Sequence, residues 1–230
     1  ISGREDISLA NKVIFTLAAD HGITEEGVSP YPKEVTAQMV YNFVRGGAAI
    51  NVLAAHVGAR VVVADVGVAA DVTPSPQLYI KKVGRGTQNM ARGPAMSRQD
   101  AIRSIETGIE LFDEEYAKGI DIIGTGEMGI GNTTASSALT AAFTGVSLES
   151  ITGRGAGLDN AGLLRKIGVI QRSLDVNRPD PTDPLDVLSK VGGFEIGALV
   201  GVMLAAAVKK KPILIDGFIS GAAALVAYQL

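Results

Sequence analysis

A single carboxylate, Glu127, lies in a stretch of small residues that offers many backbone N–H groups. Glycines occupy positions 124, 126, 129 and 131 around it, and Asn132 to Thr134 follow. Glycines let the backbone approach a ligand closely, and Asn or Thr can cap the helix that comes next. The positive end of such a helix is a natural place for a phosphate. The acid in the middle of this predicted loop favours a cationic or electrophilic group close by.

Residues 124–129 formally match the G-x-G-x-x-G pattern of dinucleotide-binding folds. The match occurs in the middle of the chain, and no acidic residue ends a second strand about 20 residues later, as ribose binding would need. Glu127 would also bring negative charge to the place where the pyrophosphate docks. A dehydrogenase that uses NAD is therefore an alternative with little support.

Two further glycine-rich turns precede predicted helices. Residues 153–157 (Gly-Arg-Gly-Ala-Gly) are followed by a helix that contains Lys166. Glycine N–H groups and a lysine one or two turns into a helix can together hold a phosphate, although a flexible loop with a solvated lysine gives the same pattern. Residues 189–195 predict a third glycine turn, which ends at Glu195.

The pair Asp20-His21 follows another apolar run and could indicate a metal site or an acid–base dyad. The second histidine of the chain is His56, on an alanine-rich stretch, and the chain has no cysteine. Two distant histidines without cysteine argue against a dedicated transition-metal site. We interpret Asp20 as a polar residue at the rim of the fold.

Four apolar runs, at 13–19, 60–67, 120–124 and 212–217, predict strands that finish with small residues and a carboxylate. Near-continuous apolar runs are typical of strands buried on both faces, as in a parallel sheet. Between them the patterns predict helices at 33–45, 48–57, 97–118 (with Ser97 as N-cap), 132–143, 160–174, 194–208 and 219–229, with a loop at 175–186.

This alternation predicts an α/β fold: a three-layer, Rossmann-like domain with a largely parallel sheet flanked by helices. Ligands of such folds bind outside the carboxyl ends of the strands. We therefore expect the four acidic strand ends to gather at one rim and form a site.

Composition narrows the function further. The 230 residues are 47% hydrophobic, carry a net charge of -3 and include no cysteine. No basic stripe of the kind that nucleic acids need is present, and no apolar run is long enough to span a bilayer. The lack of cysteine excludes disulfides and a cysteine nucleophile and fits a reducing cytoplasm. We expect a cytoplasmic protein that binds neither nucleic acid nor membrane.

Six motifs together resemble one enzyme family over almost the whole chain. They are residues 18–22 (AADHG), 32–36 (PKEVT), 92–97 (RGPAMS), 126–134 (GEMGIGNTT), 188–194 (LSKVGGF) and 214–218 (LIDGF). In this order they resemble the nicotinate-nucleotide–dimethylbenzimidazole phosphoribosyltransferases, which make the lower-ligand nucleotide of cobalamin.

The resemblance implies that nicotinate mononucleotide passes its phosphoribosyl group to 5,6-dimethylbenzimidazole or a related base. The products are α-ribazole 5′-phosphate and nicotinate. It implies a homodimer, and helices 33–45 and 194–208 are candidates for burying an apolar face between subunits. No cofactor and no metal are expected, because the leaving pyridinium is already activated by its positive nitrogen.

By position, the resemblance gives Glu127 an auxiliary catalytic role beside the base and the ribose. Tyr31 and Met39 border the base pocket and leave the choice of base open. The substrate-binding residues that it implies are Tyr31, Met39, Gly126, Met128, Gly129, Asn132, Thr133, Gly153, Gly155, Lys166, Glu195 and Asp216.

The chain also departs from the family pattern. A Pro-Pro-Gly-Ser-Leu-Gly-type motif of family members is absent before Ile1, and the glutamate usually assigned as the general base is expected beyond Leu230. Both segments help to build the small helical domain of the family. Residues 1–230 are therefore expected to be the large α/β domain alone, with weak or no catalysis by itself. A nucleotide-binding or assembly domain without catalysis is the alternative.

Overall fold

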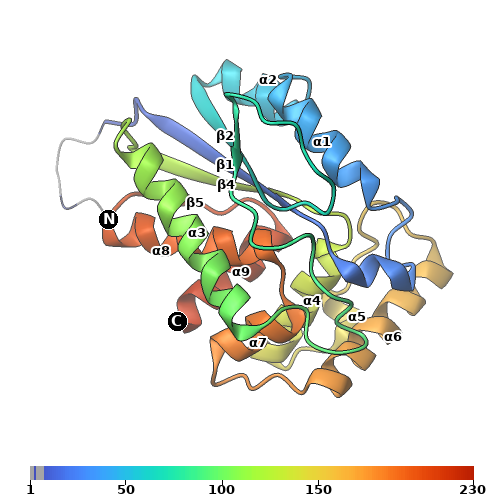
Figure 1. Cartoon of the computed structure of the whole chain (residues 1–230). Helices are drawn as coiled ribbons and strands as arrows, with labels where there is room; N and C mark the ends of the chain where they lie inside the picture. Colours follow the sequence, from blue (N-terminus) through green and yellow to red (C-terminus); the bar gives the residue numbers. More distant parts are fainter. Residues whose placement is uncertain (1–2, 4–7) are drawn as a thin grey trace.

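A parallel sheet forms the centre of the computed structural model, which describes residue 3 and residues 8–230. Its strands, in chain order, are β1 (Lys12–Ala19), β2 (Ala59–Gly67), β3 (Leu78–Ile80), β4 (Ile122–Met128) and β5 (Ile213–Leu214). They lie in the order β3-β2-β1-β4-β5, and every neighbouring pair is parallel. Figure 1 labels the strands β2, β1, β4 and β5 of this sheet. The predicted α/β fold with a parallel sheet is confirmed. The short edge strand β3 was not predicted.

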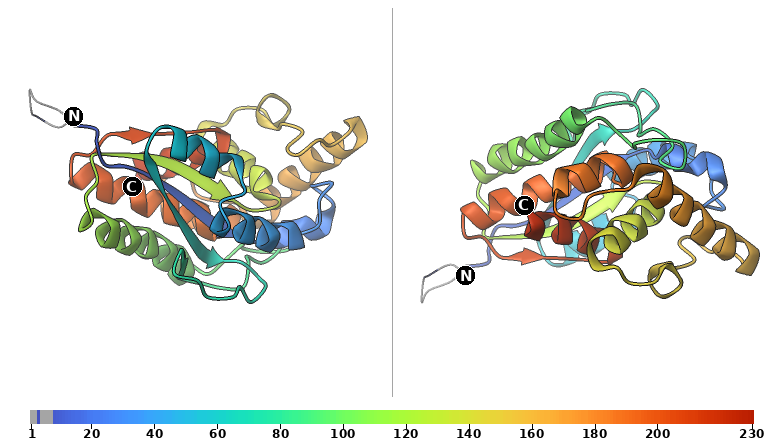
Figure 2. Two further views of the ribbon diagram at one scale, coloured as in Figure 1. Left: turned by 90° about the horizontal axis from the view of Figure 1, so that it is seen from above. Right: turned by 90° about the horizontal axis from the view of Figure 1, so that it is seen from below.

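Helices cover both faces of this sheet (Figure 2). On one face α8 (Phe194–Val208) contacts β1, β2 and β4, and α3 (Arg98–Tyr116) and α9 (Phe218–Gln229) pack against α8. On the other face lie α1 (Glu34–Val44) and α2 (Ala49–His56), which contact β2. The remaining helices are η1 (Gly22–Glu26), α4 (Asn132–Thr144), α5 (Leu148–Ile151), α6 (Asn160–Asn177) and α7 (Pro184–Val191).

The contact between α3 and α8 is unusually close because glycines line it. A Cβ atom on Gly108 would lie 1.9 Å from the carbonyl oxygen of Ala198, and one on Gly201 would lie 1.9 Å from that of Ile105. Almost every residue of α8 is buried by this packing and by the sheet. The expectation that 194–208 offers an apolar face to a second subunit is therefore wrong, because that face is already covered within the chain.

Two predicted boundaries differ from the structure. The expected loop at 175–186 ends early, because Asp183 caps α7 and Pro184 occupies its first turn, where proline is favourable. Residues 189–191, expected in a glycine turn, belong to this helix, so the turn before α8 is reduced to Gly192 and Gly193.

The second difference concerns Glu127, which was expected in a loop but lies on β4. The strand continues to Met128 because it stays paired with β1, where Thr16 faces Gly126 and Ala18 faces Met128. The glycines here fit a tightly packed strand: a Cβ atom on Gly126 would lie 3.2 Å from the carbonyl oxygen of Phe15. Over residue 3 and residues 8–230, no helix has both the length and the hydrophobicity to cross a membrane.

Candidate active site

The sheet topology itself marks the place where a ligand would bind. β1 has β2 on one side and β4 on the other, so the chain reverses its direction of winding between β1 and β4. A crevice forms outside the carboxyl ends of strands at such a switch point. Asp20 and His21 follow β1 there, and Glu127 lies near the end of β4. The expected gathering of strand ends at one edge is confirmed by the parallel pairing.

Glu127 is a carboxylate in an environment that disfavours its charge. Burial raises the pKa of Glu127 to about 7, and the nearby Glu195 and Asp216 act in the same direction, against a hydrogen bond from Asn132 and the charge of His21. The bond runs from Nδ2 of Asn132 to Oε2 of Glu127 over 2.5 Å. A carboxyl group with a pKa near neutrality can exchange a proton or respond to a cation at physiological pH.

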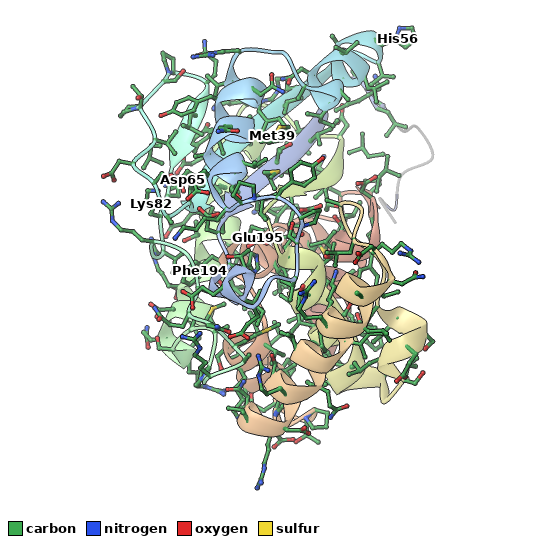
Figure 3. The ribbon with its side chains drawn as sticks, turned by 90° about the vertical axis from the view of Figure 1, so that its right-hand side faces the viewer. Met39, His56, Asp65, Lys82, Phe194 and Glu195 are labelled. Atoms are coloured by element: carbon green, nitrogen blue, oxygen red, sulfur yellow. The ribbon has the colours of Figure 1, made fainter. Side chains whose placement is uncertain are left out.

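Glu195, at the start of α8, is fully buried and lies against His21. Its Oε1 is 2.6 Å from Nε2 of His21, and its Oε2 has no hydrogen-bond partner among the described residues. A Cβ atom on Gly129 would lie 3.0 Å from Oε1 of Glu195 and 3.3 Å from Nδ2 of Asn132, so the Glu195 and Glu127 groups are neighbours across this glycine. Figure 3 shows Glu195 near the centre of the view, next to Phe194.

Lys166 is a buried cation on α6 with no carboxylate partner among the described residues. Its Nζ donates to Oγ1 of Thr133 over 2.7 Å and to the carbonyl oxygen of Gly153 over 3.3 Å, and the residue is 0% exposed. Burial lowers the pKa of Lys166 to about 8. Gly155, with φ +56°, lies against the same group, because its Cβ would be 3.4 Å from Nζ. An anion here would restore the missing counter-charge.

The first turn of α4 faces this lysine. The N-cap is Gly131, with φ 94° and no side-chain cap. The expectation that Asn132 to Thr134 cap the helix is therefore wrong: Asn132 instead binds Glu127, and Thr133 accepts from Lys166. The positive end of a helix without a side-chain cap, next to a buried ammonium group, suits a phosphate.

The other predicted residues take different places. Met39 and Met128 pack against one small cluster on the α1 face of the sheet, and Asp216 is exposed after β5. Tyr31 is 52% exposed in the segment between η1 and α1. Gly126 lines an apolar groove with Ile14 and Leu214, on the opposite side of β4 from Glu127 because side chains alternate along a strand.

The structure assigns two more residues to this site: Asp20, which was expected at the rim from the sequence, and His21, which was considered only as part of a metal site or an acid–base dyad. His21 is 2% exposed and bonded to Glu195, and Asp20 is 5% exposed, with its Oδ2 accepting from the backbone N of Ala69 over 2.8 Å. Burial raises the pKa of Asp20 despite this bond. Their position directly after a buried strand was the available signal. His56, in contrast, is exposed at the end of α2, far from Glu195 in Figure 3.

The formal dinucleotide pattern has no structural counterpart. Its first two glycines, Gly124 and Gly126, lie inside β4 and not in a turn after a strand. A dinucleotide fingerprint needs them in that turn, where the backbone meets the pyrophosphate. The dehydrogenase alternative loses its structural basis.

Comparisons with known proteins agree on one family. A family model described as "Phosphoribosyltransferase" matches residues 1–230. Curated proteins named nicotinate-nucleotide–dimethylbenzimidazole phosphoribosyltransferase, from Desulforudis audaxviator and Roseiflexus sp., are 59% and 58% identical over all 230 residues. The chain spans 65% of the length of each of these relatives.

A crystal structure of CobT from Thermus thermophilus superposes with a TM-score of 0.93 at 44% identity, over 96% of this chain and 66% of that one. A second structure, of nicotinate-nucleotide–dimethylbenzimidazole phosphoribosyltransferase from the same organism, has a TM-score of 0.90 at 43% identity, over 96% of this chain and 65% of that one. With the family model matched from end to end, this chain belongs to the nicotinate-nucleotide–dimethylbenzimidazole phosphoribosyltransferase family.

Proposed function

We propose that the carboxyl edge of the sheet binds nicotinate mononucleotide and transfers its phosphoribosyl group to 5,6-dimethylbenzimidazole or a related base. Relatives over the full chain carry the name of this reaction. The products would be α-ribazole 5′-phosphate and nicotinate, as in the synthesis of the cobalamin nucleotide loop. The observation that carries the proposal is the buried ammonium group of Lys166 beside the start of α4, which has no side-chain cap.

The phosphate would lie between Lys166, Thr133 and the turn that contains Gly153 and Gly155. Charge-assisted hydrogen bonds from an ammonium group to a phosphate are among the stronger ones in proteins. A phosphate there would also supply the counter-charge that the buried lysine lacks. This arrangement fixes one end of the nucleotide relative to Glu127.

The ribose would then lie near Glu127, with Glu195 and Asp216 in its electrostatic range. As the bond between the anomeric carbon and nicotinate breaks, its electron pair stays with the leaving nitrogen and the ribose gains positive character. Carboxylates placed in advance stabilise that charge without reorganisation. The incoming base forms the new C–N bond and passes its proton to a general base, with Glu127 in an auxiliary role.

The remaining residues would complete the substrate site. Tyr31, Met39 and Met128 would border the incoming base, with Gly126 on the same side of β4 as Met128. Gly129 and Asn132 would shape the strand end around the ribose. We further propose that residues 1–230 correspond to the large α/β domain of these relatives, that the protein forms a homodimer and that it works in the cytoplasm.

A nucleotide-binding domain without catalysis is the second candidate. It is favoured by the buried ammonium group of Lys166, which suits a phosphate whether or not a transfer follows. The two candidates predict the same binding and differ in product formation.

The test uses the chain itself and a chimera in which the flanking segments of the Desulforudis audaxviator relative complete it. Calorimetry measures nicotinate mononucleotide binding, and mass spectrometry identifies products after incubation with a panel of benzimidazoles, phenols and adenine. Binding by both proteins and α-ribazole 5′-phosphate from the chimera support the proposed transfer. Binding without any product, even in the chimera, favours the binding domain, and the absence of binding overturns both.

A further inference from the structure

The imidazole of His21 is enclosed between the end of β1, the start of α8 and the first turn of α4. Its side chain is 1% exposed, and Nε2 lies 2.6 Å from Oε1 of Glu195. A Cβ atom on Gly193 would lie 2.3 Å from the ring, and one on Gly131 would lie 3.6 Å from its Cβ. Backbone on two sides therefore fixes both the ring and the carboxylate that it binds.

The titratable groups that act on His21 are all carboxylates. Asp20 precedes it, Glu195 faces it from α8 and Glu127 acts on it from β4, while Asp216 joins the same cluster through Glu127. The two lysines at this edge are engaged elsewhere. Lys166 binds Thr133, and Nζ of Lys82 lies 2.7 Å from Oδ2 of Asp65.

We infer that His21 is a positioning residue of this site: its imidazolium holds the Glu195 carboxylate in place and supplies the positive charge that lets the partly buried Glu127 ionise beside the buried Glu195. His21 does not touch the substrate in this arrangement. Without the positive charge of His21, the carboxylates of Glu195 and Glu127 would repel each other at close range. The carboxylate with the weaker hydrogen bonds would then stay protonated.

The balance of effects on His21 supports the charged form. Burial works to lower the pKa of His21, but the charge and hydrogen bond of Glu195 outweigh burial and raise this pKa above its ordinary value, helped by Asp20 and Glu127. Since the pKa of an imidazolium is raised, the ring keeps its positive charge to higher pH than a free histidine. The unpartnered Oε2 of Glu195 shows that this carboxylate depends on His21 as its hydrogen-bond donor among the described residues.

The meaning of this pair for catalysis rests on the proposed function, but the ionisation of Glu127 exists without any ligand. It can be measured on the ligand-free chain by ¹³C NMR of labelled Glu carboxyl carbons, with the Glu127 signal assigned by its loss in E127Q. The variants are H21Q, E195Q and the double variant. Glutamine places a neutral N–H donor near the position of Nε2, so H21Q keeps the hydrogen bond and removes the charge. H56Q, at an exposed histidine, is the matched control.

In H21Q we expect the titration midpoint of Glu127 to rise by roughly one pH unit, as the loss of one nearby charge predicts. In the double variant the negative charge of Glu195 is also gone, so the midpoint should return close to that of the wild type. E195Q should also change the Glu127 midpoint little. His21 loses its carboxylate partner and becomes neutral, so one negative and one positive charge disappear together. If His21 is neutral and has only a structural role, the opposite pattern is expected. The titration midpoint of Glu127 would then stay the same in H21Q and fall in E195Q. Either of those results overturns the inference.

If H21Q does not fold, E195Q alone decides the matter, since a clear fall of the Glu127 midpoint in E195Q contradicts a charged His21. In the completed chimera, the pH at which the transfer rate reaches half its maximum should move in H21Q with the Glu127 midpoint. An NMR shift without any transfer activity would overturn the proposed function and leave the role of His21 intact.

Discussion

Glu115 and Glu127 lie at opposite edges of the same sheet and experience opposite environments. Glu115, near the end of α3, is 2% exposed and accepts hydrogen bonds from Tyr79 and Lys118, each over 2.6 Å, and from Arg60 near the start of β2. Burial works to raise the pKa of Glu115, but these three donors together lower it. Glu127, at the end of β4, has one such donor, Asn132, and carboxylates around it, and its pKa rises to about 7.

The difference separates Glu115, which holds the fold together, from Glu127, which we propose is available to the ligand. A buried carboxylate with several donors is satisfied and ties a helix to the sheet. A partly buried carboxylate among other carboxylates, such as Glu127, costs stability, and groups with shifted pKa values concentrate at functional sites. The amino edge of this sheet is therefore structural, and the carboxyl edge carries the features of an active site.

The starts of two helices show the same contrast. Oγ of Ser97 accepts from the backbone N of Asp100 over 3.0 Å at the start of α3, and the Asp100 carboxylate accepts from Ser97 in return. α4 starts at Gly131 without a side-chain cap. The predicted Ser97 cap is confirmed, whereas the start of α4, which has no side-chain cap, lies beside Lys166.

The largest effect is expected from E127Q, which tests whether the carboxyl edge costs stability. The folded pKa of Glu127 is raised from 4.5 to about 7, so the folded chain holds this proton more tightly than the unfolded chain. That contribution to stability is present below pH 4.5 and is lost as the pH rises through 7. Urea unfolding should show the stability of E127Q relative to the wild type growing over this window by up to about 3 kcal/mol. E149Q, at an exposed carboxylate, is the matched control, and equal curves for E127Q and wild type would break the comparison.

K166M tests whether the buried ammonium group serves a ligand. Loss of a charge-assisted hydrogen bond to phosphate should weaken nicotinate mononucleotide binding by roughly 10- to 100-fold. Without ligand, K166M should melt at a higher temperature than the wild type, because an unpaired buried cation is removed. Calorimetry and thermal unfolding measure the two effects, with K209M on the exposed end of α8 as the control.

The affinity of the wild type should also fall as the pH rises above about 8, because burial lowers the pKa of Lys166 to that value and a bound anion needs the charged form. This dependence should disappear in K166M. An affinity that stays constant up to high pH would place the phosphate away from Lys166.

E115Q should have the opposite sign from E127Q. Removing the charge of a carboxylate that three donors share should destabilise the chain by about 1–2 kcal/mol at neutral pH. Because the folded pKa of Glu115 is lowered, its contribution exists above the unfolded pKa and is lost as the pH falls. Denaturant unfolding at neutral and acidic pH measures this, and nucleotide affinity should not change. If E115Q were more stable than the wild type, the charges of Glu115 and Glu127 would affect stability in the same direction, which would contradict the comparison.

The smallest effect is expected from S97A, which removes a cap at a structural helix start. It should cost about 1 kcal/mol of stability and leave nucleotide affinity unchanged. S147A is the control, since Ser147 occupies the N-cap of α5 without a side-chain cap bond. Thermal unfolding of both variants sharpens the contrast with α4, and a lost affinity in S97A would contradict it.

Most of the fold could be predicted because it depends on local patterns. The apolar runs 13–19 and 60–67 became β1 and β2 almost residue for residue, and the apolar spacing of 97–118 together with its Ser97 cap became α3. The three-residue strand β3 could not be predicted in this way, because its pairing with β2 supplies what its short sequence lacks. The same holds for Glu127, which pairing with β1 moved from a predicted loop onto β4.

Many residues of the candidate site could be predicted from the sequence, but the side-chain contacts between them could not. Glycine turns and single polar residues could be seen along the chain, and the family resemblance assigned them to a nucleotide. The bond between His21 and Glu195 joins residues 174 positions apart, and no local pattern indicates it.

The sequence by itself determined the alternation of strands and helices, the parallel sheet and the family, because hydrophobic periodicity and ordered motifs are properties of the chain alone. The tertiary structure decided that Glu115 has several hydrogen-bond donors whereas Glu127 lies among other carboxylates. Ionisation depends on burial and on the charges within a few ångströms, and those neighbours come from distant segments that meet only after folding.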